Sequence, residues 1–137
     1  MGQAEPFKPI ALVVEDDVLQ RELVAVLLDE SELSVIQCQS AEQALRVLKK
    51  MGGRVSMMFT DVKLAGKIDG MELAHFATRC YPKIRVIVTS GLALPKSLPE
   101  GAMFMPKPWL PLDVLREAGR LQGLAAPSPA RTVSLRK

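Results

Sequence analysis

Residues 10–17 read IALVVEDD, an apolar run that ends directly in three acidic residues. Consecutive apolar residues without alternation are typical of a strand that is buried on both faces, as in a parallel sheet covered by helices. Side chains placed directly after such a strand lie at its carboxyl end, where open α/β sheets gather their functional groups. The segment therefore predicts an α/β fold with a site that includes Glu15 and Asp16.

Short apolar runs and amphipathic segments continue to alternate along the chain. Further strands are predicted at residues 33–38 (LSVIQC), 55–60 (VSMMFT), 84–88 (IRVIV) and 102–105 (AMFM). Helices are predicted at residues 17–30, 41–50, 71–79 and 111–124, with Ser40 as an N-cap and Pro111 in a first turn. This order implies a parallel sheet with helices on both faces and right-handed crossovers.

The first helix and residues 91–101 carry two further predictions. In the first helix, Val18, Leu23, Val26 and Leu27 recur at helical spacing, and the pattern predicts that they face the core. By alternation, residues 91–101 (GLALPKSLPEG) should also form a helix, but they contain two prolines. A proline inside a helix removes a hydrogen bond and clashes with the preceding turn, so we expect a turn or two of helix at most.

Composition and charge narrow the class of protein. The chain has 137 residues, of which 48% are apolar and 24% charged, as in one ordinary globular domain. Its net charge of +3 comes from residues 125–137, and no clustered basic face is available for phosphates. No apolar run approaches the length of a membrane span, and the amino terminus lacks a signal-peptide core. We expect a cytoplasmic protein that binds neither membranes nor, by itself, nucleic acid.

Polar side chains also follow the later strands. Asp61 follows the third strand, Thr89 the fourth and Lys107 the fifth. Two carboxylates about 5 Å apart at an effective dielectric near 20 repel by roughly 3 kcal/mol, so converging acidic groups favour a bound cation. An all-oxygen site suits Mg²⁺. With Mg²⁺, a lysine and a hydroxyl around it, Asp61 is equipped to accept a phosphoryl group.

Four motifs, in this order, resemble the receiver domain of two-component response regulators: VVEDD, FTD, VTS and MPKPW. The resemblance covers about residues 9–124. It implies a flavodoxin-like, doubly wound sheet of five parallel strands in the order 2-1-3-4-5, here with a shortened fourth helix. By composition, residues 1–8 are expected to be a flexible leader, and residues 125–137, which are rich in Ala, Pro, Ser and Arg, a disordered basic tail.

The resemblance also implies a role for each residue of the site. Asp61 matches the phosphoacceptor, Thr89 the switch hydroxyl, Phe104 the switch aromatic and Lys107 the lysine that pairs with the phosphoryl oxygens. The Lys107–Pro108 peptide is expected to be cis. The implied Mg²⁺ ligands are Glu15, Asp16, Asp61 and the backbone carbonyl of Lys63.

The implied function is phosphorelay signalling. The phosphoryl donor would be a histidine kinase or a histidine phosphotransfer protein. No output domain follows, so the signal would be a changed contact with an unknown downstream protein, and a homodimer is possible. The chain would catalyse only its own phosphorylation and dephosphorylation, and is therefore not expected to be an enzyme in the usual sense.

The loop after Asp61 departs from the family pattern. Lys63 is a long cation, Ala65 stands where proline is common, and residues 62–70 (VKLAGKIDG) are one residue longer than usual. These features predict an altered lifetime of the aspartyl phosphate and a looser loop that weakens metal binding slightly.

The sequence leaves two alternative functions. A non-phosphorylated pseudo-receiver would act as a binding module. A phosphatase with an aspartyl nucleophile would need a second acid two residues after Asp61, where this chain has Lys63.

Overall fold

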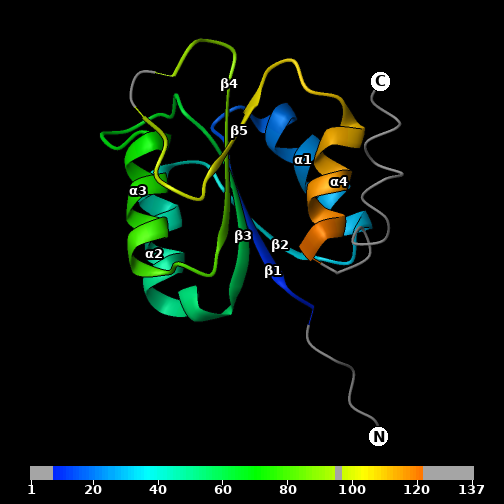
Figure 1. Ribbon diagram of the computed structural model, residues 1–137, viewed down its shortest axis with the longest axis horizontal. Helices are drawn as coiled ribbons and strands as arrows, with labels where there is room; N and C mark the ends of the chain where they lie inside the picture. Colours follow the sequence, from blue (N-terminus) through cyan, green and yellow to red (C-terminus); the bar gives the residue numbers. More distant parts are fainter. Residues whose placement is uncertain (1–7, 95–96, 122–137) are drawn as a thin grey trace, which may run out of the picture.

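The sheet is fully parallel and has the expected strand order. The computed structural model describes residues 8–94 and 97–121. Within them the order is β2-β1-β3-β4-β5, and every neighbouring pair is parallel (Figure 1). The strands are β1 (Ile10–Val14), β2 (Ser34–Cys38), β3 (Val55–Asp61), β4 (Arg85–Ser90) and β5 (Met103–Pro106).

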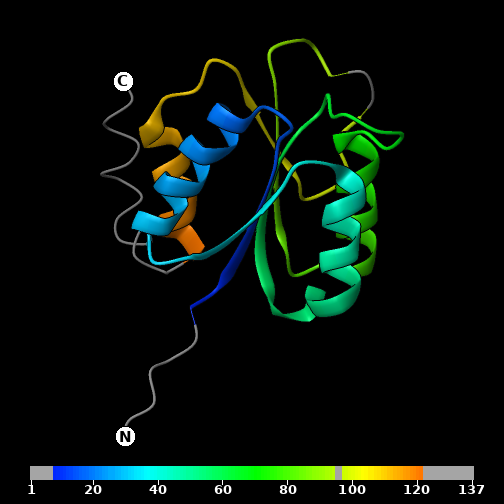
Figure 2. The same cartoon turned by 180° about the vertical axis from the view of Figure 1, so that it is seen from behind.

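Helices cover both faces of this sheet. Figures 1 and 2 show α1 and α4 on one face and α2 and α3 on the other. The helices are α1 (Val18–Glu30), α2 (Ala41–Met51), α3 (Gly70–Cys80) and α4 (Pro111–Leu121), and a short 3-10 turn (Gly52–Arg54) precedes β3. The sequence thus predicted the layers and nearly all of the elements.

The core consists of two layers because strand side chains alternate between the faces. Leu12 and Met58 belong to the layer under α2 and α3, whereas Val13 and Phe59 belong to the layer under α1 and α4. All five residues of β1 are buried. Burial of both faces explains why the strands read as continuous apolar runs.

The helix starts follow from capping side chains. Ser40 accepts a hydrogen bond from the amide of Gln43, as the sequence predicts. Asp17 accepts one from the amide of Gln20, and Asp69 forms a capping box with Glu72. Each such bond satisfies an amide that the first helical turn leaves unpaired.

The face that α1 turns toward the core differs from the predicted one. Of the four residues in the predicted stripe, only Leu27 is buried. Val18, Leu23 and Val26 are about half exposed, at 52%, 48% and 53%. The buried residues of α1 are Val24, Ala25, Leu27 and Leu28. Apolar residues lie on both sides of this helix, so spacing alone selected the wrong stripe.

The described part of the segment between β4 and β5 is irregular. Residues 91–94 and 97–101, the part of it that the structure describes, contain no helix. Leu94 and Leu98 pack against the core, and Nε2 of His75 on α3 donates a 3.1 Å hydrogen bond to the carbonyl of Ser97. The shortened helix is therefore replaced by irregular chain over these residues.

Some expectations fall outside the described residues. They concern most of the leader at residues 1–8, the last helix beyond Leu121, and the tail at residues 125–137. Among the residues that the structure describes, no helix combines the length and the apolar content needed to cross a membrane.

Candidate functional site

Three predicted carboxylates meet where the strand order reverses. The chain leaves β1 toward β2 on one side and reaches β3 on the other, so this is the switch point of the sheet. Ligand atoms of Glu15, Asp16 and Asp61 all lie within 4.8 Å of one another. Glu15 and Asp61 are buried, with 7% and 9% of their surface exposed, and Asp16 is exposed.

Lys107 brings one positive charge to these carboxylates. Its Nζ lies 3.2 Å from Oδ1 of Asp61 and 3.6 Å from Oε1 of Glu15. It also donates a 2.8 Å hydrogen bond to Oε1 of Gln20 on α1. Gln20 was not predicted as part of the site. Its position in the first turn after the acidic residues was the available signal.

Burial raises the pKa of both Glu15 and Asp61. It raises the pKa of Glu15 to about 7, against the hydrogen bond from the amide of Asp17, and the charge of Asp61 adds to the rise. Burial also raises the pKa of Asp61, although Lys107 opposes that change. One ammonium thus compensates the three carboxylates incompletely, and additional positive charge would stabilise their ionised forms.

The turn after β1 is held from two sides. Oε2 of Glu15 accepts a 3.0 Å hydrogen bond from the amide of Asp17. Arg21 on α1 donates to the carbonyl of Glu15 at 2.8 Å and to the side chain of Gln37 at 3.1 Å. Arg21 was not predicted. It fixes the backbone from which the acidic side chains project.

Thr89 lies beside the phosphoacceptor candidate but points elsewhere. It pairs with Asp61 in the β3–β4 register and is buried, with 1% of its surface exposed. Its hydroxyl donates a 2.7 Å hydrogen bond to the carbonyl of Met105 on β5. Phe104, which precedes Met105 on β5, is half-buried and lies opposite Val88 in the β4–β5 register. Any bond from Thr89 to a group on Asp61 requires the hydroxyl to leave Met105.

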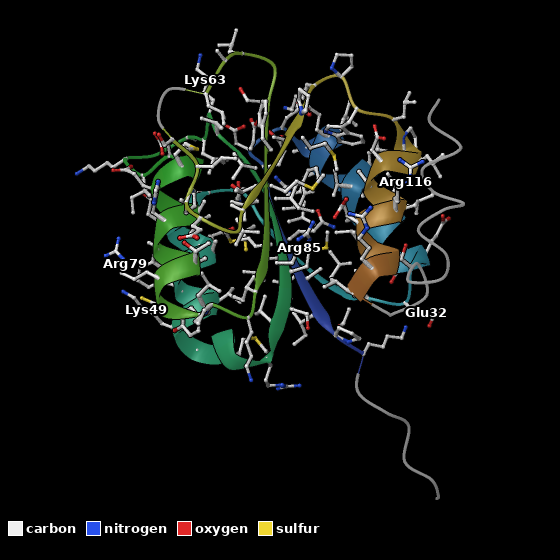
Figure 3. The ribbon with its side chains drawn as sticks, viewed as in Figure 1. Glu32, Lys49, Lys63, Arg79, Arg85 and Arg116 are labelled. Atoms are coloured by element: carbon white, nitrogen blue, oxygen red, sulfur yellow. The ribbon has the colours of Figure 1, made fainter. Side chains whose placement is uncertain are left out.

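The loop after β3 is closely packed at both ends. The amide of Val62 donates to the carbonyl of Thr89 at 3.0 Å, and the amide of Gly70 donates to the carbonyl of Val62 at 2.8 Å. Any Cβ at Gly70 would clash with the carbonyl of Asp61. Figure 3 shows Lys63 at this end of the sheet, where its side chain is exposed.

An open pocket of about 500 Å³ lies next to Lys107. It is lined by Gln20, Leu23, Gly91, Lys107, Pro108 and Trp109. The Lys107–Pro108 peptide is cis, as expected. Trp109 packs edge-on against Phe59 at 5.8 Å between ring centroids, and its buried Nε1 has no hydrogen-bond partner among the described residues.

The donor set fits a hard divalent cation. Carboxylate oxygens are the ligands that Mg²⁺ prefers, and this ion retains several waters. The exposed Asp16 leaves one side of the cluster open to solvent. A carboxylate beside a lysine and a site for a divalent cation can serve as a nucleophile toward phosphorus.

Comparisons with known proteins agree with this geometry. The family model for the response regulator receiver domain matches residues 11–104. The receiver domain protein from Methanospirillum hungatei, described as CheY-like, superposes with a TM-score of 0.75 at 23% identity, covering 89% of this chain and all of that one.

Curated proteins also match in sequence, among them two that match most of this chain. A two-component response regulator of Arabidopsis thaliana is 29% identical over 118 residues, or 84% of this chain. The sensor kinase CckA of Brucella abortus is 30% identical over 103 residues, or 72% of this chain. The chain spans only 19% and 11% of the length of these relatives.

Proposed function

This chain belongs to the response regulator receiver domain family, and we propose that it accepts a phosphoryl group on Asp61 from a phosphohistidine donor. The observation that supports this most is the placement of Asp61. Its carboxylate is buried, clusters with Glu15 and Asp16, and lies 3.2 Å from the ammonium of Lys107. The proposal takes residues 9–124 as the receiver domain.

In the proposed reaction, an oxygen of Asp61 attacks phosphorus. The new P–O bond forms as the P–N bond of the donor breaks, and its electron pair stays on the imidazole nitrogen. Lys107 pairs with the phosphoryl oxygens. Glu15, Asp16, Asp61 and the carbonyl of Lys63 would hold Mg²⁺, which would supply positive charge against the charge developing on those oxygens. The chain catalyses only its own phosphorylation and dephosphorylation.

The response to phosphorylation involves Thr89 and Phe104. The phosphoryl group adds strong hydrogen-bond acceptors and negative charge beside Thr89. The Thr89 hydroxyl then exchanges the carbonyl of Met105, now 2.7 Å away, for a phosphoryl oxygen. Phe104, half-buried on the same strand as Met105, changes its rotamer as this bond is lost. The altered surface is read by a downstream protein, and a homodimer is one form that this contact can take.

The exposed face of α1 suits docking of the donor. Leu19, Leu23 and Val26 expose 79%, 48% and 53% of their surface, and Leu23 lines the pocket beside Lys107. An apolar helix face next to a reactive group fits an amphipathic helix that presents a phosphohistidine. We therefore place a histidine kinase or a phosphotransfer protein on this face. Such a donor draws on ATP, so the proposal places the chain in the cytoplasm.

The test is to incubate the protein with acetyl phosphate and Mg²⁺ and to measure its intact mass, with Asp61→Asn as the control. We expect one phosphoryl group on the wild type and none on the variant. A phosphoryl group on both proteins would contradict the assignment of Asp61.

The irregular segment between β4 and β5 favours the pseudo-receiver as the alternative, because receiver domains commonly carry their output there. Beryllium fluoride, a mimic of the phosphoryl group, separates the two. We expect it to change the fluorescence of Trp109 when Mg²⁺ is present. A protein that gains no phosphoryl group and does not respond to beryllium fluoride would be a pseudo-receiver.

A further inference from the structure

Glu42 joins the start of α2 to the loop that follows the phosphoacceptor candidate. It lies in the first turn of α2 and is half-buried. Its Oε2 accepts a 3.1 Å hydrogen bond from the backbone amide of Lys67. The loop is pinned at one end by Val62 and at the other by Gly70. Glu42 therefore holds the middle of a loop whose ends are already fixed.

The loop backbone also packs directly against the Glu42 carboxylate. Gly66 has a φ of +101°, and a Cβ at this position would lie 2.7 Å from Oε1 of Glu42. That oxygen is buried and has no hydrogen-bond partner among the described residues. Backbone amides, first its own and then that of Lys67, hold the pKa of Glu42 below its ordinary value. The Glu42 carboxylate thus contacts the backbone of the loop, and the contact is not a salt bridge.

The position of this contact connects it to the site. Lys63 lies between Asp61 and the anchored Lys67, and its carbonyl is the backbone ligand of Mg²⁺ in the proposed function. We propose that Glu42 is a positioning residue for the Mg²⁺ site, because it limits the positions that the Lys63 carbonyl can take. This inference rests on the proposed function. It also explains how a loop without the common proline is kept in place.

Three substitutions separate the reach of Glu42 from its charge. Glu42→Gln retains an acceptor oxygen at the same distance from the backbone. Glu42→Asp retains the negative charge at the start of α2 but is one methylene shorter, so it does not reach Lys67. Glu42→Ala removes both. A general effect on α2, whose first turn favours negative charge, would spare Glu42→Asp and affect Glu42→Gln.

The measurements are amide hydrogen exchange of Lys67 without metal and Mg²⁺ affinity by calorimetric titration. In Glu42→Ala and Glu42→Asp we expect faster exchange at Lys67 and an affinity roughly tenfold weaker, the usual scale for losing a group that orients a ligand. Glu42→Gln should stay near the wild type in both. Glu30→Ala, at the exposed end of α1, is the matched control for loss of charge and should change neither.

Three results would overturn the inference. Wild-type affinity in Glu42→Ala would make Glu42 a purely structural residue. If Glu42→Asp bound Mg²⁺ as tightly as the wild type and Glu42→Gln bound it more weakly, the negative charge of Glu42 would matter for the site. Its hydrogen bond with Lys67 would not. A wild type that binds no Mg²⁺ would overturn the proposed function as well, and only that result does so.

Discussion

Buried carboxylates occur at both ends of the sheet, and their cations differ in number. At the amino end, Glu117 on α4 exposes 3% of its surface. Arg85 donates to its Oε1 at 2.9 Å, and Arg120 to its Oε2 at 3.1 Å. Figure 3 shows Arg85 between the sheet and α4. At the carboxyl end, Lys107 is the one cation among the described residues that pairs with Glu15 and Asp61, at 3.6 Å and 3.2 Å.

The difference separates a carboxylate whose charge is compensated from a carboxylate cluster whose charge is not. Two guanidinium groups on one carboxylate satisfy both of its oxygens, so the amino end is charge-compensated as it stands. Three carboxylates around one ammonium are not compensated, and burial keeps the pKa of Glu15 at about 7. A bound cation would therefore stabilise the carboxyl end of the sheet, whereas the amino end needs no additional charge.

The largest effect is expected at the amino end. Glu117→Ala should lower the free energy of unfolding by about 2–3 kcal/mol, because it leaves Arg85 without its carboxylate. The partial exposure of Arg85, 34% for its side chain, keeps the effect below that of a fully buried pair. Urea denaturation measures it. Arg116→Ala, which breaks the exposed pair with Asp113, is the control and should cost at most a few tenths of a kcal/mol.

The next effect is the pH dependence of Mg²⁺ binding. Below a pH of about 7, the ion must displace a proton from Glu15. Its affinity should therefore fall by roughly tenfold for each pH unit below that value. Calorimetric titration across this range measures the dependence. A flat profile would mean that Glu15 is already ionised without metal, and the contrast between the two ends would then be lost.

A smaller effect is expected on the stability of the metal-free protein. The folded pKa of Glu15 is raised above its ordinary value of 4.5, so the folded state keeps a proton that the unfolded state releases. Stability should therefore fall as the pH rises from about 4.5 to about 7. Glu15→Gln should remove this fall and be more stable than the wild type above pH 7 by about 1 kcal/mol. Thermal unfolding without metal at both ends of this range checks the sign.

The smallest effect is expected from Lys63, which follows Asp61 by two residues and has an exposed side chain. Lys63→Asn should change the dephosphorylation rate, because the long cation can reach the phosphoryl group or the attacking water. The loss of phosphoryl mass after the donor is removed gives the rate. An unchanged rate would show that Lys63 contributes only its backbone to this end of the molecule.

Much of the site could be predicted because parallel strands end at the same edge of a sheet. That rule predicts from sequence that Glu15, Asp16, Asp61, Thr89 and Lys107 lie together. Gln20 and Glu42 could not be found in this way. Their partners are 87 and 25 residues away in the chain. No local pattern encodes a single hydrogen bond between a helix and a distant loop.

The fold shows the same division. Apolar runs located the strands to within one or two residues, and caps located helix starts. Both are local features of the sequence. The first helix was correctly placed, but its buried face was not, because Leu23 and Val24 are neighbours of equal apolarity and only the packing against the sheet decides between them. The tertiary structure likewise decided how the loop after Asp61 is held. The missing proline and the extra residue predict a looser loop there, and the hydrogen bond from the Lys67 amide to Glu42 is a contact that local sequence does not reveal.

The sequence by itself determined the alternation of strands and helices, the edge of the sheet that carries the site, and the acidic and basic groups that meet there. These follow from side-chain periodicity and from charge, which are properties of each segment alone. Only the tertiary structure decided which cations compensate which carboxylates, and to what degree each group is buried. Those outcomes depend on contacts between segments far apart in the chain, and they distinguish the uncompensated carboxyl end of the sheet from the compensated amino end.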